Sequence, residues 1–165
     1  MAPSEPEMLP LDPTRDAAAA TLLAAAGEET VGQAAMRLAA ARADGSTIIA
    51  RVAGDELFAV AFVQIDGLTA ELPVIAVAPE HRRQGHGRAC VDHALRLVGR
   101  RPLAVEIGES TLGFYRACGF KLIGKRRRPD GAVRYRLAAH ARLPQTSAIT
   151  LQRPSLPTTP ADRPG

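Results

Sequence analysis

The sequence predicts one α+β (α/β) domain, in which a mixed central sheet of six to seven strands is flanked by about four helices. Three observations lead to this class. Two helical segments come first, three consecutive strands follow, and the second half alternates strand, helix, strand, helix and two strands. The 165 residues, 46% of them hydrophobic, suffice for one core and are too few for two. We therefore expect an antiparallel meander joined to a right-handed parallel crossover.

The N-terminal quarter carries signals for one short strand and two helices. Met8–Leu11 is a candidate first strand, and Asp12 or Thr14 is a candidate N-cap for the helix that follows. The alanine-rich stretch 16–26 predicts the first helix. A second helix is predicted over about 29–43, where apolar residues recur at helical spacing.

Three consecutive strands are predicted over 47–53, 57–65 and 70–77, because these segments are rich in β-branched and aromatic residues. Gly54-Asp55 between the first two is a hairpin signature, and Gly67 marks the next turn. Together they predict the antiparallel meander.

The second half supplies the crossover and a closing hairpin. Gly99 and Gly119 follow two apolar-periodic segments and are placed to end helices. Asp130-Gly131 is a further hairpin signal. The predicted elements are a helix over 89–98, a strand over 103–107, a helix over 110–118, and strands over 120–125 and 133–137.

The two ends of the chain differ from the middle in composition. Residues 1–7 are polar and proline-bearing, and residues 138–165 are rich in proline and threonine. Both segments are predicted to be disordered, because neither can bury enough apolar surface to order its backbone. The folded domain is therefore expected to span 8–137.

Charge and cysteine content exclude several classes. A net charge of +4 does not define a nucleic-acid-binding protein. Cys90 and Cys118 cannot form a disulfide framework, and they indicate two buried thiols in a reducing compartment. The first fourteen residues hold no Lys or Arg, and the apolar run Ala17–Ala26 is too short to span a bilayer. A cytoplasmic location and no membrane partner are expected.

The most informative segment lies between the third meander strand and the helix after it. Arg82-x-x-Gly85-x-Gly87 places two glycines where that helix begins. Glycine lets the backbone approach a ligand, and the first turn of a helix offers unpaired N–H groups at the positive end of its dipole. This combination predicts a pyrophosphate site, with added positive charge from Arg83 and Arg88.

Two other phosphate-binding patterns do not fit this segment. A dinucleotide-binding fingerprint needs a third glycine, and Cys90 stands at that position. A P-loop needs Gly-Lys-Ser/Thr, which the sequence lacks. The preceding antiparallel meander also fits neither nucleotide-binding fold.

Two motifs instead resemble those of one known family. The run AVAPEHRRQGHGRA is similar to the acetyl-CoA signature of GNAT acetyltransferases, Gln/Arg-x-x-Gly-x-Gly/Ala after a strand that ends in Val-x-Pro-Glu. Phe114-Tyr115-Arg-Ala-Cys-Gly119-Phe120 is similar to the family's Phe/Leu-Tyr-x-x-x-Gly-Phe. The resemblance covers about 8–137 and implies the GNAT fold. It also implies an N-acetyltransferase that moves the acetyl group of acetyl-CoA to a primary amine of a small molecule or protein, in a direct ternary complex without a metal.

The resemblance also implies where acetyl-CoA, the co-substrate, binds. The backbone of the third meander strand would pair with the pantetheine arm as an added strand does. The glycine loop would surround the pyrophosphate, mostly through main-chain N–H groups. The implied coenzyme-binding residues are Ile75, Ala76, Val77, Arg82, Arg83, Gln84, Gly85, His86, Gly87, Arg88, Ala89, Ser110 and Tyr115.

Two residues are candidates for proton transfer. Tyr115 is implied to be the general acid, since a phenol stays protonated at neutral pH, and the alternative is a packed aromatic. Glu71 precedes Gly85 by 14 residues, the offset of the catalytic glutamate in histone-type relatives. An apolar-lined carboxylate there would have a raised pKa and act as a base, whereas an exposed one facing a cation would not. Glu106 and Glu109 are rival bases.

Several residues are left with more modest interpretations. Gly108 stands where many relatives have an asparagine that contacts coenzyme A, so this contact is missing or comes from Ser110. His86 is expected to be solvated, and His81 is either exposed or in contact with the coenzyme's 3′-phosphate. The run Lys125–Arg128 is either a solvated hairpin edge or a guide for an acidic acceptor or nucleic acid.

Alternatives from other functional classes stay open. One is a catalytically inactive acetyl-CoA-binding sensor that regulates a partner. Another is a toxin-like acetyltransferase that acts on aminoacyl-tRNA, although nucleic acid is not the expected partner. A homodimer is compatible with the resemblance, since dimers are common among relatives.

Overall fold

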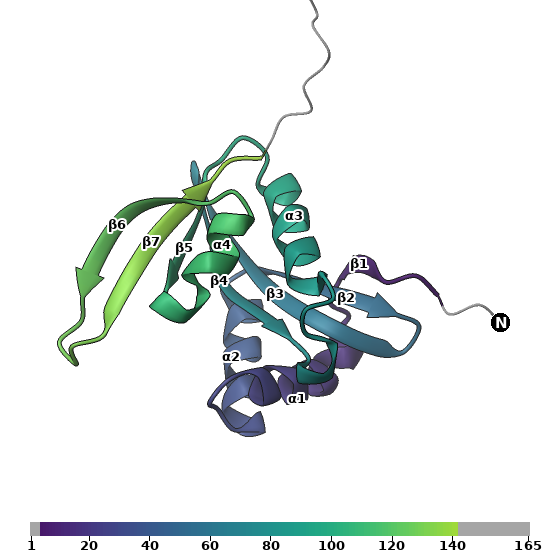
Figure 1. Cartoon of the computed structure of the whole chain (residues 1–165). Coiled ribbons are helices and arrows are strands. Elements are labelled where there is room, and N and C mark those ends of the chain that lie inside the picture. Colours follow the sequence, from purple (N-terminus) through teal and green to yellow (C-terminus); the bar gives the residue numbers. More distant parts are fainter. Residues whose placement is uncertain (1–3, 142–165) are drawn as a thin grey trace, which may run out of the picture.

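The computed structural model describes residues 4–141, and seven strands in this range form one sheet in the order β1-β2-β3-β4-β5-β7-β6 (Figure 1). Neighbouring strands are antiparallel except β4 and β5, which are parallel, so the predicted mixed sheet is confirmed. The strands are β1 (Glu7–Pro10), β2 (Thr47–Ala53), β3 (Glu56–Asp66), β4 (Thr69–Val77), β5 (Leu103–Ile107), β6 (Lys121–Arg127) and β7 (Val133–Ala139).

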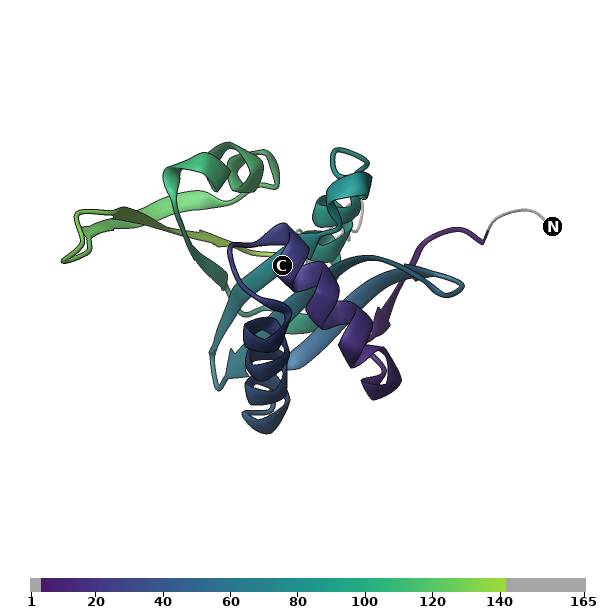
Figure 2. The ribbon, with the colours of Figure 1, turned by 90° about the horizontal axis from the view of Figure 1, so that it is seen from below.

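Helices lie on both faces of the sheet (Figures 1 and 2). Helices α1 and α2 pack on one face, where their alanine and leucine side chains meet Ile48, Val60 and Phe62. Helices α3 and α4 pack on the other face and form a second core with β3, β4, β5 and β7. The helices are α1 (Asp16–Ala26), α2 (Val31–Ala43), α3 (His86–Val98) and α4 (Leu112–Ala117), with 3-10 turns η1 (Pro13–Arg15), η2 (Pro79–His81) and η3 (Glu109–Thr111).

Local signals and one long-range ion pair fix the N-terminal helices. Thr30 and Gln33 form a reciprocal capping box at the start of α2, with bonds of 3.1 and 2.8 Å. Near the other end of α2, the Arg42 guanidinium donates to the Asp16 carboxylate at 2.6 Å and to the Leu11 carbonyl at 3.0 Å. Arg42 therefore ties α2 to α1 and to the end of β1.

A β-bulge at Pro73 changes the direction of side chains along β4. Proline has no N–H to give to a ladder, and the pairing of β4 with β3 shifts around it. Leu72 packs in the α3 core, whereas Val74 packs in the α1–α2 core. Strict alternation would have put both on one face, so the bulge resets the faces for the rest of β4.

Strands β4 and β5 pair at two positions and then diverge (Figure 1). Ala70 pairs with Leu103 and Glu71 with Ala104, and no further pair follows. Beyond Glu71, β4 has β3 on one side, and none of the strands in residues 4–141 pairs with its other side. Its backbone groups on that edge therefore remain available to an extended partner.

The structure also corrects several predicted boundaries. The first strand begins at Glu7, and the last continues to Ala139 because Ala138 and Ala139 pair with β5, so the domain extends past both predicted limits. Helix α3 begins at His86, three residues before the predicted start. The predicted helix over 110–118 consists of η3 followed by α4. The rest of the two segments predicted to be disordered, 1–3 and 142–165, lies outside the described residues.

None of the helices in 4–141 combines the length and the apolar character needed to cross a bilayer.

Candidate active site

The loop before α3 and the first turn of α3 form an open cradle of main-chain amides. Gly85, the N-cap residue, has φ +84°, and Arg83 has φ +62°, which is uncommon for a residue with a side chain. The first N–H groups of α3, as of any α-helix, have no partner within the helix, and none of the side chains in residues 4–141 caps them. Such a turn beside a helix N-terminus is suited to binding an anion.

Gly87 is the point where the cradle meets α4 and the end of β4. A Cβ at Gly87 would lie 3.2 Å from the Phe114 ring and 3.6 Å from a Val77 methyl group. The first of these distances is shorter than ordinary carbon–carbon contact. The glycine therefore lets Phe114 from α4 reach across to α3, beside the diverging strands.

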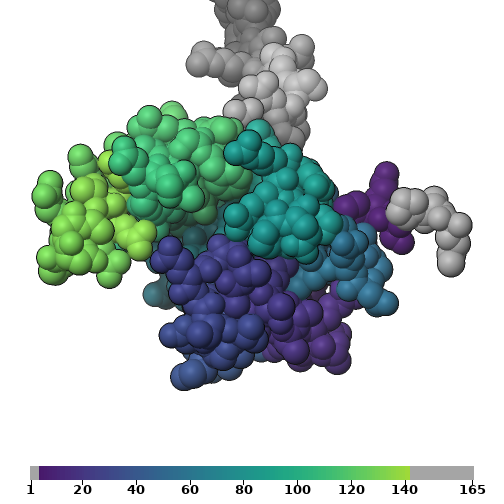
Figure 3. Space-filling model, turned by 60° about the horizontal axis from the view of Figure 1, so that its bottom comes forward, coloured from purple at the N-terminus to yellow at the C-terminus, as the bar shows by residue number. Residues whose placement is uncertain are grey.

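The surface around this point is hollowed. In the space-filling view, the α3 segment (teal), the α4 segment (green) and helices α1–α2 (purple to blue) border a recess (Figure 3). Ile75 and Val77 are half-buried on the α3 side of β4, and Ala76 is buried on the other side. The backbone of these three residues pairs with β3 on one edge only.

His86 is buried, so the expectation of a solvated side chain was wrong. Its ring is 6% exposed and stacks on Phe58 with centroids 4.7 Å apart. Arg51 donates from Nε to Nδ1 of His86 at 3.1 Å. Burial lowers the pKa of His86, and the nearby Arg51 and His81 lower it further, so the ring is neutral at pH 7. His86 therefore holds the start of α3 against β2 and β3.

Two other side chains fasten the loop before α3. His81 contacts Glu56 through Nε2 at 2.8 Å and packs edge-on against Phe58. The Arg82 guanidinium donates to the Ala26 carbonyl, at the C-terminal end of α1, at 3.4 Å. Arg83 and Gln84 are exposed, Arg88 is exposed on α3, and Ala89 is half-buried.

Tyr115 lies in the core between α4 and the sheet, in the same cluster as Ile75 and Val77. Its ring is 6% exposed and packs edge-on against Phe114 and Phe120. Burial raises the pKa of Tyr115 to about 12. Within residues 4–141 the hydroxyl has no hydrogen-bond partner, and it does not belong to the fully buried polar atoms that lack one.

The three candidate bases have exposed side chains, and two of them pair with arginines. Glu71 is exposed, and its Oε1 accepts from the Arg136 guanidinium at 2.9 Å, which matches the second of its two interpretations. Glu106 accepts from Arg126 Nε at 3.0 Å, and this bond lowers its pKa. Glu109 is exposed on η3. Of the two interpretations of Glu71, the structure therefore supports the exposed carboxylate that faces a cation.

Sequence analysis did not assign a role to two residues near the ends of β4 and β5, Phe114 and Arg134. The coenzyme contact that it assigned to Ser110 stays a prediction. Phe114 was quoted only as part of a motif, and Arg134 was not considered. The Arg134 guanidinium lies 3.8 Å from the position a Cβ would take on Gly108, directly after β5. Ser110 is exposed on η3, two residues after Gly108.

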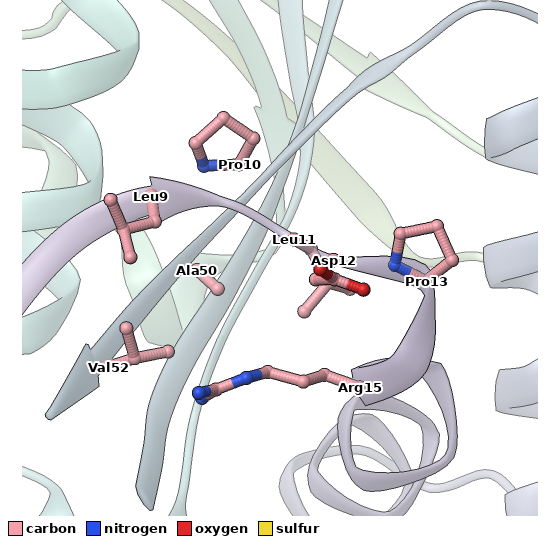
Figure 4. Close-up of a pocket in the computed structure, with 8 residues that line it drawn as sticks. All are labelled: Leu9, Pro10, Leu11, Asp12, Pro13, Arg15, Ala50 and Val52. Carbon is pink, nitrogen blue, oxygen red and sulfur yellow. The ribbon is translucent and has the colours of Figure 1, made fainter. Parts of the chain in front are cut away.

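Two further hollows border other parts of the molecule, and the second shares Arg88 with the start of α3. One of about 490 Å³ lies between β1, β2 and η1, at the far edge of the sheet, and Arg15 extends across it toward β2 (Figure 4). Since three strands separate this edge from β4, it is roughly 14 Å away. A second hollow of about 650 Å³ lies between α3 and the start of β6, bordered by Arg88, Arg96 and Cys118.

The sequence matches the family model of the GNAT acetyltransferase domain over residues 19–122. This range includes β4, the cradle, α3 and Tyr115, and it covers more than half of the chain. A search of curated proteins finds no significant relative.

Solved structures of acetyltransferases share the fold. The ribosomal-protein-S18-alanine N-acetyltransferase of Escherichia coli is 22% identical, with 87% of this chain and 99% of that one covered and a TM-score of 0.71. A Bacillus subtilis acetyltransferase in complex with CoA is 19% identical (82% and 99% covered, TM-score 0.64). An aminoglycoside 6′-N-acetyltransferase complexed with coenzyme A is 16% identical (81% and 96% covered, TM-score 0.71). By its sequence match and its fold, the chain belongs to the GNAT family of acetyltransferases.

Proposed function

We propose that the chain transfers the acetyl group of acetyl-CoA to a primary amine while both substrates are bound. One observation carries the proposal: the open edge of β4 and the uncapped start of α3 lie at the same end of the sheet. An extended chain that ends in a pyrophosphate fits this pair of features, because one offers strand-like pairing and the other anion binding. Two of the similar structures contain coenzyme A.

Each part of the site then has one role. The β4 backbone at Ile75–Val77 pairs with the pantetheine arm, and the amides from Arg83 to Arg88 bind the pyrophosphate. Acetyl-CoA supplies the thioester carbonyl that the amine attacks. We assign the stabilisation of the oxyanion to a backbone N–H on the diverging edge of β4, near Val77, where no strand of residues 4–141 pairs with β4.

Tyr115 serves the leaving group. Its phenol stays protonated at all ordinary pH values because burial raises its pKa to about 12. The hydroxyl is free to donate a hydrogen bond to the sulfur as the C–S bond breaks, since no described residue accepts that bond. No covalent enzyme intermediate is required.

A sensor that binds acetyl-CoA without turnover is the second candidate. The observation that favours it is the pairing of Glu71 and Glu106 with arginines, which leaves neither carboxylate in the apolar surroundings of a strong base.

Calorimetry with acetyl-CoA and a thiol-release assay over a broad panel of amines test both candidates. We expect micromolar to low-millimolar binding of acetyl-CoA and amine-dependent release of thiol. Tight binding without turnover of any amine would favour the sensor. No heat from acetyl-CoA at millimolar concentration would refute both.

A further inference from the structure

Three arginines share one face of the β6–β7 hairpin and form what we call the arginine surface: Arg126, Arg134 and Arg136. Arg126 pairs with Arg134 across the two strands, and Arg136 lies two residues further along β7, so all three point to the same side. Glu106 of β5 is the register partner of Arg136 of β7, so its side chain lies on the same face. The hairpin extends past α1 and α2 (Figure 2).

The arginine surface encloses a hollow of about 230 Å³. Gly124 also lines it, next to an irregularity in the β6–β7 pairing, and contributes no side chain. The three guanidiniums surround Glu106, and all three lower the pKa of its carboxyl, the bond from Arg126 most strongly. The hollow is therefore small, and positively charged groups border it.

The positive charges exceed the carboxylates available to them. Arg126 pairs with Glu106 and Arg136 pairs with Glu71. Arg134 forms no ion pair or hydrogen bond with any residue of 4–141, although it is half-buried. A half-buried guanidinium has lost part of its hydration, and an anion that bound there would restore those interactions.

The arginine surface lies where a second substrate would approach. The cradle and Tyr115 belong to elements on the α3–α4 face of the sheet, whereas Glu71, Glu106 and the three arginines point to the opposite face. Arg134 reaches Gly108, directly after β5 and beside the divergence from β4. An acceptor that enters opposite the coenzyme therefore meets Arg134 next to the opening between these strands.

We propose that the acceptor of this acetyltransferase is an amine that also carries an anionic group, a carboxylate or a phosphate, and that Arg134 binds this group. The inference rests on the proposed function, because it names the acceptor class for the same site. The planar guanidinium is suited to either anion, since both accept two parallel hydrogen bonds.

Matched pairs of amines that differ in the anionic group test this. The pairs are 4-aminobutyrate with 4-aminobutanamide, the dipeptide amide Ala-Asp with Ala-Asn, and O-phosphoethanolamine with ethanolamine. We expect kcat/KM to be about tenfold or more higher for the anionic member of at least one pair, the effect of one hydrogen bond between charged groups. The first two pairs report a carboxylate site and the third a phosphate site.

Three variants show whether Arg134 is responsible. In Arg134→Gln, kcat/KM for the two members of the preferred pair should differ by less than about threefold, mainly because KM for the anionic acceptor rises. Arg134→Lys should keep part of the preference. Arg127→Gln is the control. This substitution removes the same charge from the same hairpin, but the Arg127 side chain points to the other face of the sheet. It should leave the preference unchanged.

The outcomes separate this inference from the function on which it rests. A preference for the neutral members, an equal response of Arg134→Gln and Arg127→Gln, or no turnover of any anionic amine by protein that binds acetyl-CoA would overturn it. Failure of the proposed function itself is detected separately, by calorimetry with acetyl-CoA on the same preparations, because a protein that does not bind the coenzyme cannot have that function.

Discussion

Replacing Tyr115 with phenylalanine removes the hydroxyl that we propose assists the leaving thiolate. Burial raises the pKa of Tyr115 from 10.0 to about 12, so ionising it costs about 3 kcal/mol more than in water. A thiolate with a pKa of about 8.5 would accept its proton against a gradient of about 5 kcal/mol. Tyr115 is therefore expected to donate a hydrogen bond to the sulfur rather than to transfer its proton fully.

This distinction sets the size of the effect. A hydrogen bond to a charged acceptor contributes about 1.5–3 kcal/mol, which corresponds to roughly 10- to 150-fold in kcat. Full general-acid catalysis contributes about 10²- to 10⁴-fold. We expect Tyr115→Phe to lower kcat by about 10- to 100-fold, with KM for acetyl-CoA unchanged, because the charge on sulfur develops only as the C–S bond breaks.

The variant should keep the fold. The hydroxyl has no hydrogen-bond partner within 4–141, and the ring contacts with Phe114 and Phe120 remain, so the free energy of unfolding should change by less than about 0.5 kcal/mol. Tyr135→Phe, at the only other tyrosine, is the matched control. A thiol-release assay with thermal melts checks both. A loss of kcat below threefold, or one above 10³-fold, would refute the reasoning.

The remaining predictions concern the cradle, its support and the base. Gly87→Ala should not lower Tm, because alanine favours a helix by about 1 kcal/mol, but its Cβ at 3.2 Å from Phe114 should weaken acetyl-CoA binding about tenfold or more in calorimetry. The lowered pKa of His86 means that the unfolded chain binds more protons below pH 6.5. Tm should therefore fall between pH 7 and 5, less steeply in His86→Gln, and equal slopes would contradict this. Glu71→Gln should lower kcat/KM less than tenfold and leave the midpoint of the pH dependence of kcat/KM unchanged. A shift of this midpoint would identify Glu71 as the base.

Much of the fold was predictable because its signals are local. The helix predicted over 16–26 and the strands over 47–53 and 103–107 match α1, β2 and β5. Composition and flanking glycines determine these elements with little help from distant residues. The glycine loop was predictable for the same reason, since Gly85 has the left-handed conformation that only glycine adopts readily.

The side-chain environments were not predictable, because they depend on partners far away in the sequence. His86 occupies a variable position of the loop, and Phe58 and Arg51 on neighbouring strands bury it. Glu71 faces Arg136, 65 residues later in the chain. The bulge in β4 did have a local signal, because Pro73 interrupts a predicted strand, but the interpretation passed over it.

The charges around the opening also constrain the acceptor's own chemistry. The bond from Arg126 lowers the pKa of Glu106, so this carboxylate does not take a proton readily from an ammonium group, and Glu71 is already paired with Arg136. Presenting a lysine-like amine with a pKa near 10.4 in neutral form at pH 7 costs about 4.6 kcal/mol, whereas an α-amine with a pKa near 7.8 costs about 1 kcal/mol. Without a strong base, kcat/KM should rise with pH along the acceptor's own titration. The midpoint of the pH dependence of kcat/KM should move to higher pH when Ala-Asp amide, an α-amine, is replaced by 4-aminobutyrate. The same midpoint with both acceptors would show that a group of the protein removes the proton.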